Sequence, residues 1–148
     1  MPRKRPKSLE TDVYRKLWTL ENYAYKRALA WKKTFRYTLI EEFRQHITYA
    51  KNAYITGYEM LGRFKEEKAR CFKAALGELS IVESNMDHMV SDGINIMSEK
   101  DWANVAIQID SIRVELAKLI NSLNAKGAGG SESLDFGIES VSASNKDA

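Results

Sequence analysis

The sequence predicts an all-α protein built as an up-down-up-down four-helix bundle. Both prolines, Pro2 and Pro6, lie near the start, and glycines are sparse before residue 127, so little interrupts the central sequence. Apolar residues recur there at spacings of three and four, which is the period of a helix buried on one face. Four such segments with short connections favour a bundle. The chain of 148 residues is long enough to bury one core without disulfides or a structural metal.

The first half of the chain supplies two of the four helices. One is expected over about residues 9–31, because an apolar stripe runs through this stretch, and Ser8 or Thr11 is its candidate N-terminal cap. The next is expected over about residues 37–61, with Gly62 ending it.

The second half supplies the other two helices. Residues 64–90 carry an apolar line, with basic residues leading and acidic residues following. Ser98 and Asp101 form a candidate capping box for the fourth helix, which continues to about Lys126. Its apolar positions, spaced by three and four as in bundle packing, are Trp102, Val105, Ile109, Ile112, Leu116, Leu119 and Leu123.

The predicted helical region separates the chain into an N-terminal arm, a bundle and a tail. Residues 1–8 form a basic N-terminal arm, and residues 9–126 form the bundle. Residues 127–148 are rich in Gly and Ser, with too few apolar residues for a core, so we expect a disordered tail.

Charge is divided by position along the chain. Residues 1–73 hold 18 Lys and Arg against 8 Asp and Glu, whereas residues 74–148 hold 5 against 12. The first of these segments also holds 13 of the 15 aromatic residues. Lys and Arg neutralise phosphates, and aromatic rings stack on unpaired bases. This combination indicates a protein that binds RNA and DNA.

Ten basic residues are the candidate nucleic-acid-binding set: Arg15, Lys16, Lys26, Arg27, Lys32, Lys33, Arg36, Arg44, Lys51 and Arg63. Four acidic residues are the candidate partner-binding set: Glu78, Glu83, Asp87 and Asp92. Reversing the charge of Arg15, Lys26, Arg44 and Lys51 is expected to abolish nucleic-acid binding without loss of stability, because these positions lie off the apolar stripes.

Two alternatives stay open beside nucleic-acid binding. A charge run is often only a solvated face, and the same division of charge suits docking of the basic half on another protein or another copy. Aromatic residues beside the main stripes, such as Trp18, Tyr25 and Tyr58, fit a wide core and self-association equally well. An interaction scaffold is therefore the second hypothesis.

The residues of known catalytic and metal sites are not arranged in a recognisable pattern. The two histidines, His46 and His88, lack the Glu-x-x-His pairing of a di-iron bundle, and no Gly-rich phosphate loop or nucleophilic triad occurs. Cys71 is the single cysteine and favours a reducing compartment. No apolar run has the length of a membrane helix. We expect a cytoplasmic protein with no enzymatic activity, no metal, no cofactor and no membrane association.

Several stretches carry a resemblance to a known family. They are LIEEFRQHITYAKNAYITGYEMLGR at residues 39–63, ALGELSIVES at residues 75–84, and MSEKDW before the helix that ends LAKLINSL. Residues 14–123 resemble small bacterial four-helix bundles. This family comprises the accessory variability (Avd) proteins of diversity-generating retroelements and related proteins encoded in intervening sequences of ribosomal RNA genes. The ribosomal branch has paired arginines and an Asn-Ile-Ala-Glu-Gly run. Here Gln45 follows Arg44 in place of a second arginine, and only Asn52 and Gly57 match residues of that run. This departure favours the retroelement branch.

The resemblance implies a specific role. Such accessory proteins form homopentameric barrels with a basic surface or channel, bind RNA and DNA, and associate with the reverse transcriptase of the retroelement. The polymerase performs the chemistry, and the bundle supports template-RNA-primed mutagenic cDNA synthesis. The other branch implies an oligomeric protein-interaction scaffold.

Overall fold

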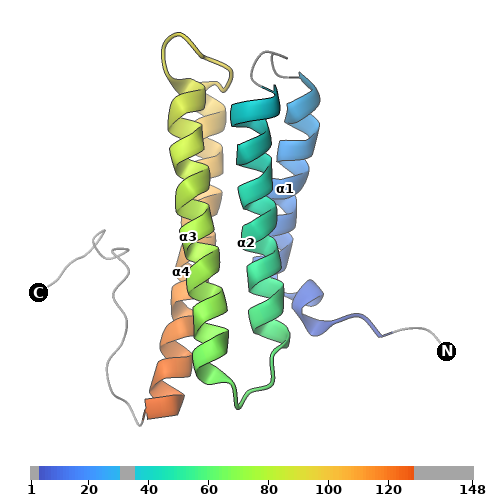
Figure 1. Ribbon diagram of the computed structural model, residues 1–148, viewed down its shortest axis with the longest axis vertical. Coiled ribbons are helices and arrows are strands. Elements are labelled where there is room, and N and C mark those ends of the chain that lie inside the picture. The colour runs from blue at the N-terminus through green and yellow to red at the C-terminus, as the bar shows by residue number, and fades with distance from the viewer. Residues whose placement is uncertain (1–3, 31–35, 129–148) are drawn as a thin grey trace, which may run out of the picture.

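The computed structural model describes the backbone of residues 4–30 and 36–128 and the side chains of residues 4–30 and 38–125. Within these residues, four long helices lie side by side (Figure 1): α1 (Asp12–Ala30), α2 (Glu41–Glu59), α3 (Lys65–Val90) and α4 (Glu99–Ala128). A 3₁₀ turn (Lys7–Glu10) precedes α1, and a π-helical turn (Arg36–Ile40) precedes α2. No strand occurs in this described part of the chain, which confirms an all-α protein with four helices.

Two predicted caps, Thr11 and Ser98, are confirmed, whereas α1 begins at Asp12 and α2 at Glu41, three and four residues later than expected. The Thr11 hydroxyl accepts the backbone N–H of Tyr14 at 3.3 Å at the start of α1, and the Ser98 hydroxyl accepts that of Asp101 at 3.0 Å at the start of α4. Each bond satisfies a donor that the first helical turn leaves without a partner.

The end of α2 differs from the sequence prediction, because Gly62 does not end the helix. The helix ends at Glu59, and Met60 is already extended with φ −65° and ψ 148°. The Lys68 ammonium, from the first turn of α3, donates to the carbonyls of Gly57, Tyr58 and Met60 at 2.8, 3.1 and 3.0 Å. A side chain from the next helix therefore satisfies the free carbonyls at the end of α2.

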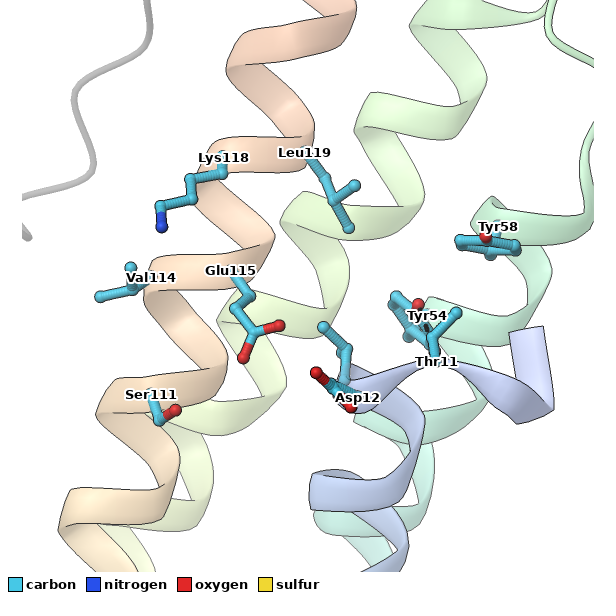
Figure 2. Close-up of a pocket in the computed structure, with 10 residues that line it drawn as sticks. Thr11, Asp12, Tyr54, Tyr58, Ser111, Val114, Glu115, Lys118 and Leu119 are labelled. Carbon is cyan, nitrogen blue, oxygen red and sulfur yellow. Dashed lines mark hydrogen bonds between the residues drawn. The ribbon is translucent and has the colours of Figure 1, made fainter. Parts of the chain in front are cut away.

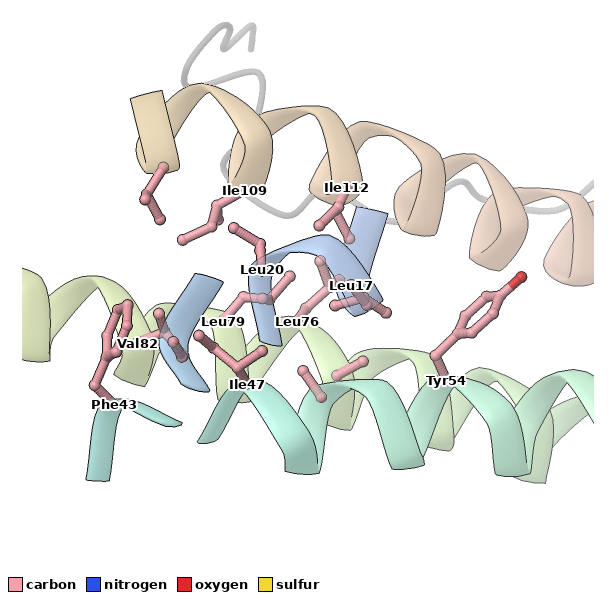
Figure 3. Close-up of a cluster of buried hydrophobic side chains, with 14 of the residues drawn as sticks. Leu17, Leu20, Phe43, Ile47, Tyr54, Leu76, Leu79, Val82, Ile109 and Ile112 are labelled. Carbon is pink, nitrogen blue, oxygen red and sulfur yellow. The ribbon is translucent and has the colours of Figure 1, made fainter. Parts of the chain in front are cut away.

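The core lies along the axis of the bundle and receives side chains from all four helices (Figure 3). Its labelled members include Leu17 and Leu20 from α1, Phe43 and Ile47 from α2, Leu79 and Val82 from α3, and Ile109 and Ile112 from α4. These residues fall on the predicted stripes. On α4, however, Trp102 lies on the predicted stripe but is 38% exposed, whereas Ile120 lies off it but is buried. The apolar periodicity therefore identified most of the buried residues of each helix.

The predicted domain limits are only partly within the described residues. The last residue of the predicted arm, Ser8, packs against the bundle. It is buried, and its N–H donates to the Glu59 carboxylate at 2.8 Å. The α4 helix continues to Ala128, two residues beyond the predicted end. The rest of the predicted tail, residues 129–148, lies outside the described residues. Among the described helices, none combines the length and apolarity that a bilayer span requires.

Candidate nucleic-acid interface

Half of the candidate basic residues are held in ion pairs within the molecule. The pairs are Arg15 with Asp12 at 2.5 Å, Lys16 with Glu115, Arg27 with Asp101 at 3.5 Å, Arg44 with Glu41, and Lys51 with Glu21 at 2.7 Å. Hydrogen bonding to Arg15 lowers the pKa of Asp12, and hydrogen bonding to Arg44 lowers that of Glu41. These cations already have counter-charges, so each offers less to a phosphate than a free cation does.

Lys51 is the clearest departure from the expected surface position. Its ammonium bonds to Glu21, which is 5% exposed and also accepts the Thr48 hydroxyl at 2.6 Å. A carboxylate at this depth needs its partners, because an unpaired buried charge is costly. This contact contradicts the assumed free surface position of Lys51, so we now expect that reversing its charge destabilises the bundle. Its role here is to join α2 to α1.

The remaining candidates divide into exposed and undescribed residues. Lys26 is exposed on α1 and makes no hydrogen bond or ion pair with the described residues. Arg63 is exposed, and its guanidinium lies 5.0 Å from the centre of the Phe64 ring. Lys32, Lys33 and the side chain of Arg36 lie outside the described residues.

The four candidate partner-binding acids do not form a free acidic surface. Glu83 pairs with Arg113, Glu78 bonds to His46 Nδ1 at 2.5 Å, and Asp87 accepts the Trp102 indole N–H at 3.3 Å. Asp92 is exposed after the end of α3 and makes no such bond with the described residues. Three of the four therefore bind other helices of the same chain.

Among the described residues, much of the positive charge that is not paired lies at one end of the bundle. Ser8 and Glu59 anchor the N-terminal segment beside the C-terminal end of α2, where the α2–α3 loop also lies (Figure 1). Residues 4–10 and 57–73 together carry eight Lys and Arg against four Glu, a balance of +4, whereas the whole chain has +3. All other residues therefore sum to −1.

We call five cations of this region the basic end: Lys4, Arg5, Lys7, Arg63 and Lys65. None of their side chains makes a hydrogen bond or an ion pair with another described residue. Glu59 belongs to the second segment and binds Ser8 of the first. Its pKa is lowered by the bond from Ser8, with smaller contributions from the nearby Lys68 and Lys7. Sequence reasoning included only Arg63 of this set. The available signal was the basic run at residues 3–7, but nothing in the sequence places that run beside the α2–α3 loop.

Lys68 belongs to the same end but serves the fold. Burial lowers its pKa, and its three N–H donors are directed to three carbonyls at the end of α2, those of Gly57, Tyr58 and Met60. An ammonium has three donors, so none remains for a phosphate. We therefore exclude Lys68 from the interface.

One groove lies between the start of α1, the end of α2 and α4 (Figure 2), with a volume of about 780 Å³. Its charged lining residues are Asp12, Glu115 and Lys118, which sum to −1. Tyr54 donates its hydroxyl to Thr11 at 2.7 Å. A net negative lining with internally bonded polar groups does not suit a phosphate.

A smaller groove of about 420 Å³ lies between the segment before α1 and the outer face of the first turns of α1. It is lined by Arg5, Leu9, Tyr14, Arg15, Trp18 and Thr19. Trp18 is 49% exposed, whereas Leu9 and Tyr14 are half-buried. Two arginines therefore line the same groove as an exposed indole ring.

The off-stripe aromatic residues divide between core and surface. Tyr14 and Tyr58 pack against the core, as a wide core predicts. Trp18, Tyr25 and Leu29 are exposed on one side of α1, since their spacing of seven and four returns to the same face. In the described residues, no three His, Cys, Asp or Glu side chains group as they would around a metal ion.

Comparison of the chain with protein-family models and with curated proteins found no match.

Proposed function

We propose that this chain is a non-catalytic nucleic-acid-binding protein whose contact surface is the basic end. The observation that carries the proposal is the concentration of net charge: residues 4–10 and 57–73 hold +4, and all others sum to −1. Phosphate backbones are bound mainly through such unpaired Lys and Arg, which release counterions from the nucleic acid. The cations that face other helices are neutralised by acids and contribute less.

The family resemblance makes the proposal more specific. It supports an up-down-up-down, homo-oligomeric bundle, a pentamer in the retroelement branch, that acts in the cytoplasm beside a reverse transcriptase. The chain would hold template RNA and cDNA while the polymerase performs mutagenic synthesis. Co-purification with the polymerase, and a cDNA synthesis assay with and without this chain, tests that part separately from binding.

A second candidate function is a protein-interaction scaffold, as in the ribosomal intervening-sequence branch. The observation in its favour is the exposed apolar face of α1, which carries Trp18, Tyr25 and Leu29. Exposed patches of this kind commonly mark protein contacts. Under this hypothesis the protein self-associates or captures a partner, and nucleic acid has no effect.

The binding experiment compares two variants with the same change in net charge. In Arg63→Glu/Lys65→Glu, two cations of the basic end are reversed. Stability should hold, because Arg63 is exposed and an acid at the first residue of α3 complements the helix dipole. The control is Lys100→Glu/Lys118→Glu, which reverses two exposed cations of α4.

Fluorescence anisotropy with labelled RNA and DNA, measured against salt, gives the result. If about five phosphates are neutralised, log K should fall with log salt at a slope of roughly −3.5 for single strands and −4.5 for duplex DNA. The basic-end variant should lose affinity and about two units of slope, while the control keeps most of both. Equal losses in the two variants would point to overall charge rather than the basic end. An absence of binding at low salt would refute the function.

A further inference from the structure

We propose that the groove on the outer face of α1 binds an unstacked base of a single-stranded nucleic acid, with the Trp18 ring as its stacking surface. The inference rests on the proposed function and specifies the form of nucleic acid that the protein prefers. The groove residues are Arg5, Leu9, Tyr14, Arg15, Trp18 and Thr19.

The size and lining of the groove suit one nucleotide. Its volume of about 420 Å³ lies within the range of small-molecule sites, at its lower end. Trp18 presents an exposed ring, and the half-buried Leu9 and Tyr14 add apolar surface beside it. Every base has an aromatic face, so stacking on an indole requires no particular sequence.

The charges around the groove suit the phosphate that accompanies a base. Arg15 is oriented by bonds to Asp12 at 2.5 Å and to the Glu10 carbonyl at 3.1 Å. A guanidinium has five N–H donors, so donors remain for a phosphate oxygen. Arg5 makes no hydrogen bond or ion pair with the described residues. The groove lining itself contains no carboxylate.

The groove adjoins the basic end, so both can belong to one nucleic-acid interface. Arg5 belongs to both, so a strand bound along the basic end can direct one base toward Trp18. Bases in a duplex are stacked inside and cannot reach this ring. The groove therefore favours a single strand, whereas the basic end alone would accept any phosphate backbone.

The direct test follows Trp18 fluorescence. The chain has three tryptophans, so Trp31→Phe/Trp102→Phe leaves Trp18 as the only one. The probe is an oligothymidine of about 15 nucleotides, a length that covers a typical single-strand site. Its controls are an abasic strand of the same length and charge and a duplex hairpin. We expect quenching of Trp18 by oligothymidine and none by the abasic strand or the hairpin.

Affinity measurements separate stacking from charge. Trp18→Ala should weaken oligothymidine binding roughly 5- to 100-fold with an unchanged salt slope, because stacking releases no counterions. Trp18→Phe keeps a ring and should retain most of the affinity. Arg5→Gln should instead reduce the salt slope by about one. The matched control is Trp102→Ala, since Trp102 is also an exposed tryptophan but lies on α4 beside Asp87.

Each other outcome has a defined meaning. Equal affinity for oligothymidine and the abasic strand, without quenching, overturns the inference and leaves the proposed function standing. No binding of any strand at low salt overturns both. Quenching that follows protein concentration without nucleic acid means that a second copy covers the groove, and this also overturns the inference. Circular dichroism of each variant establishes that it is folded.

Discussion

Replacing Lys51 with Met tests whether the buried ion pair between α1 and α2 stabilises the bundle. The Lys51 ammonium lies 2.7 Å from a Glu21 carboxylate oxygen, and the Thr48 hydroxyl binds the other oxygen. Methionine keeps a long flexible side chain but has no charge. Glu21 would then be a buried carboxylate with one hydrogen bond in place of two.

The expected loss follows from the burial of both partners. Removing one partner of a buried ion pair costs about 3–5 kcal/mol. The Lys51 side chain is 18% exposed and the Thr48 bond remains, so we expect the lower limit, about 3 kcal/mol. In a domain of this size, that loss lowers the melting temperature by roughly 10 °C.

Urea unfolding followed by circular dichroism measures the change in unfolding free energy. The control is Arg15→Met, because the Arg15–Asp12 pair has side chains 62% and 71% exposed, and such a pair contributes about 0–1 kcal/mol. The double variant Glu21→Gln/Lys51→Met should recover much of the loss, since it removes the unpaired charge. If Lys51→Met stays within about 0.5 kcal/mol of the parent, the pair is not a stabilising contact and the reasoning fails.

Two further predictions concern glycine packing and alkaline pH. A Cβ on Gly57 would lie 2.8 Å from the Cys71 Cβ, so Gly57→Ala should destabilise the protein by about 1–3 kcal/mol. A Cβ on Gly77 would meet open space, so Gly77→Ala should stabilise the protein by up to about 1 kcal/mol. Urea unfolding of the two variants measures both changes in unfolding free energy. Burial raises the pKa of Tyr23 and Tyr54 above the ordinary 10.0, so the unfolded chain releases these protons first. The unfolding free energy should therefore fall as pH rises past 10.0, and Tyr54→Phe should reduce that slope; a slope unchanged by this substitution would contradict the assignment.

The helices, and the limits of α3 in particular, could be predicted from the sequence because their signals are local. The α3 helix was expected over residues 64–90 and spans Lys65–Val90, and the Ser98 cap was found from its spacing to Asp101. Apolar periodicity and capping both depend on residues within one or two turns of each other. Such features do not require knowledge of how helices pack.

The contacts between helices could not be predicted in the same way. Lys16 binds Glu115, which lies 99 positions away in the sequence. Lys68, a residue of α3, donates to a carbonyl at the end of α2. Both depend on the rotation and register of neighbouring helices, which periodicity does not determine. For this reason the sequence indicates candidate cations by their charge alone, and it does not reveal that Lys51 contacts the buried Glu21.

The division of charge along the chain has a different meaning once the helices pack. Acids of α4 lie against cations of α1, as in the pairs of Lys16 with Glu115 and Arg27 with Asp101. Among the residues that the structure describes, this packing neutralises cations of α1 and leaves a balance of +4 at the end formed by residues 4–10 and 57–73. At physiological salt, charges act over a Debye length of about 8 Å, so paired cations in the middle add little to the field at that end. Binding of a phosphate backbone should therefore be a local contact at the basic end, and a footprint extending along all four helices would contradict it.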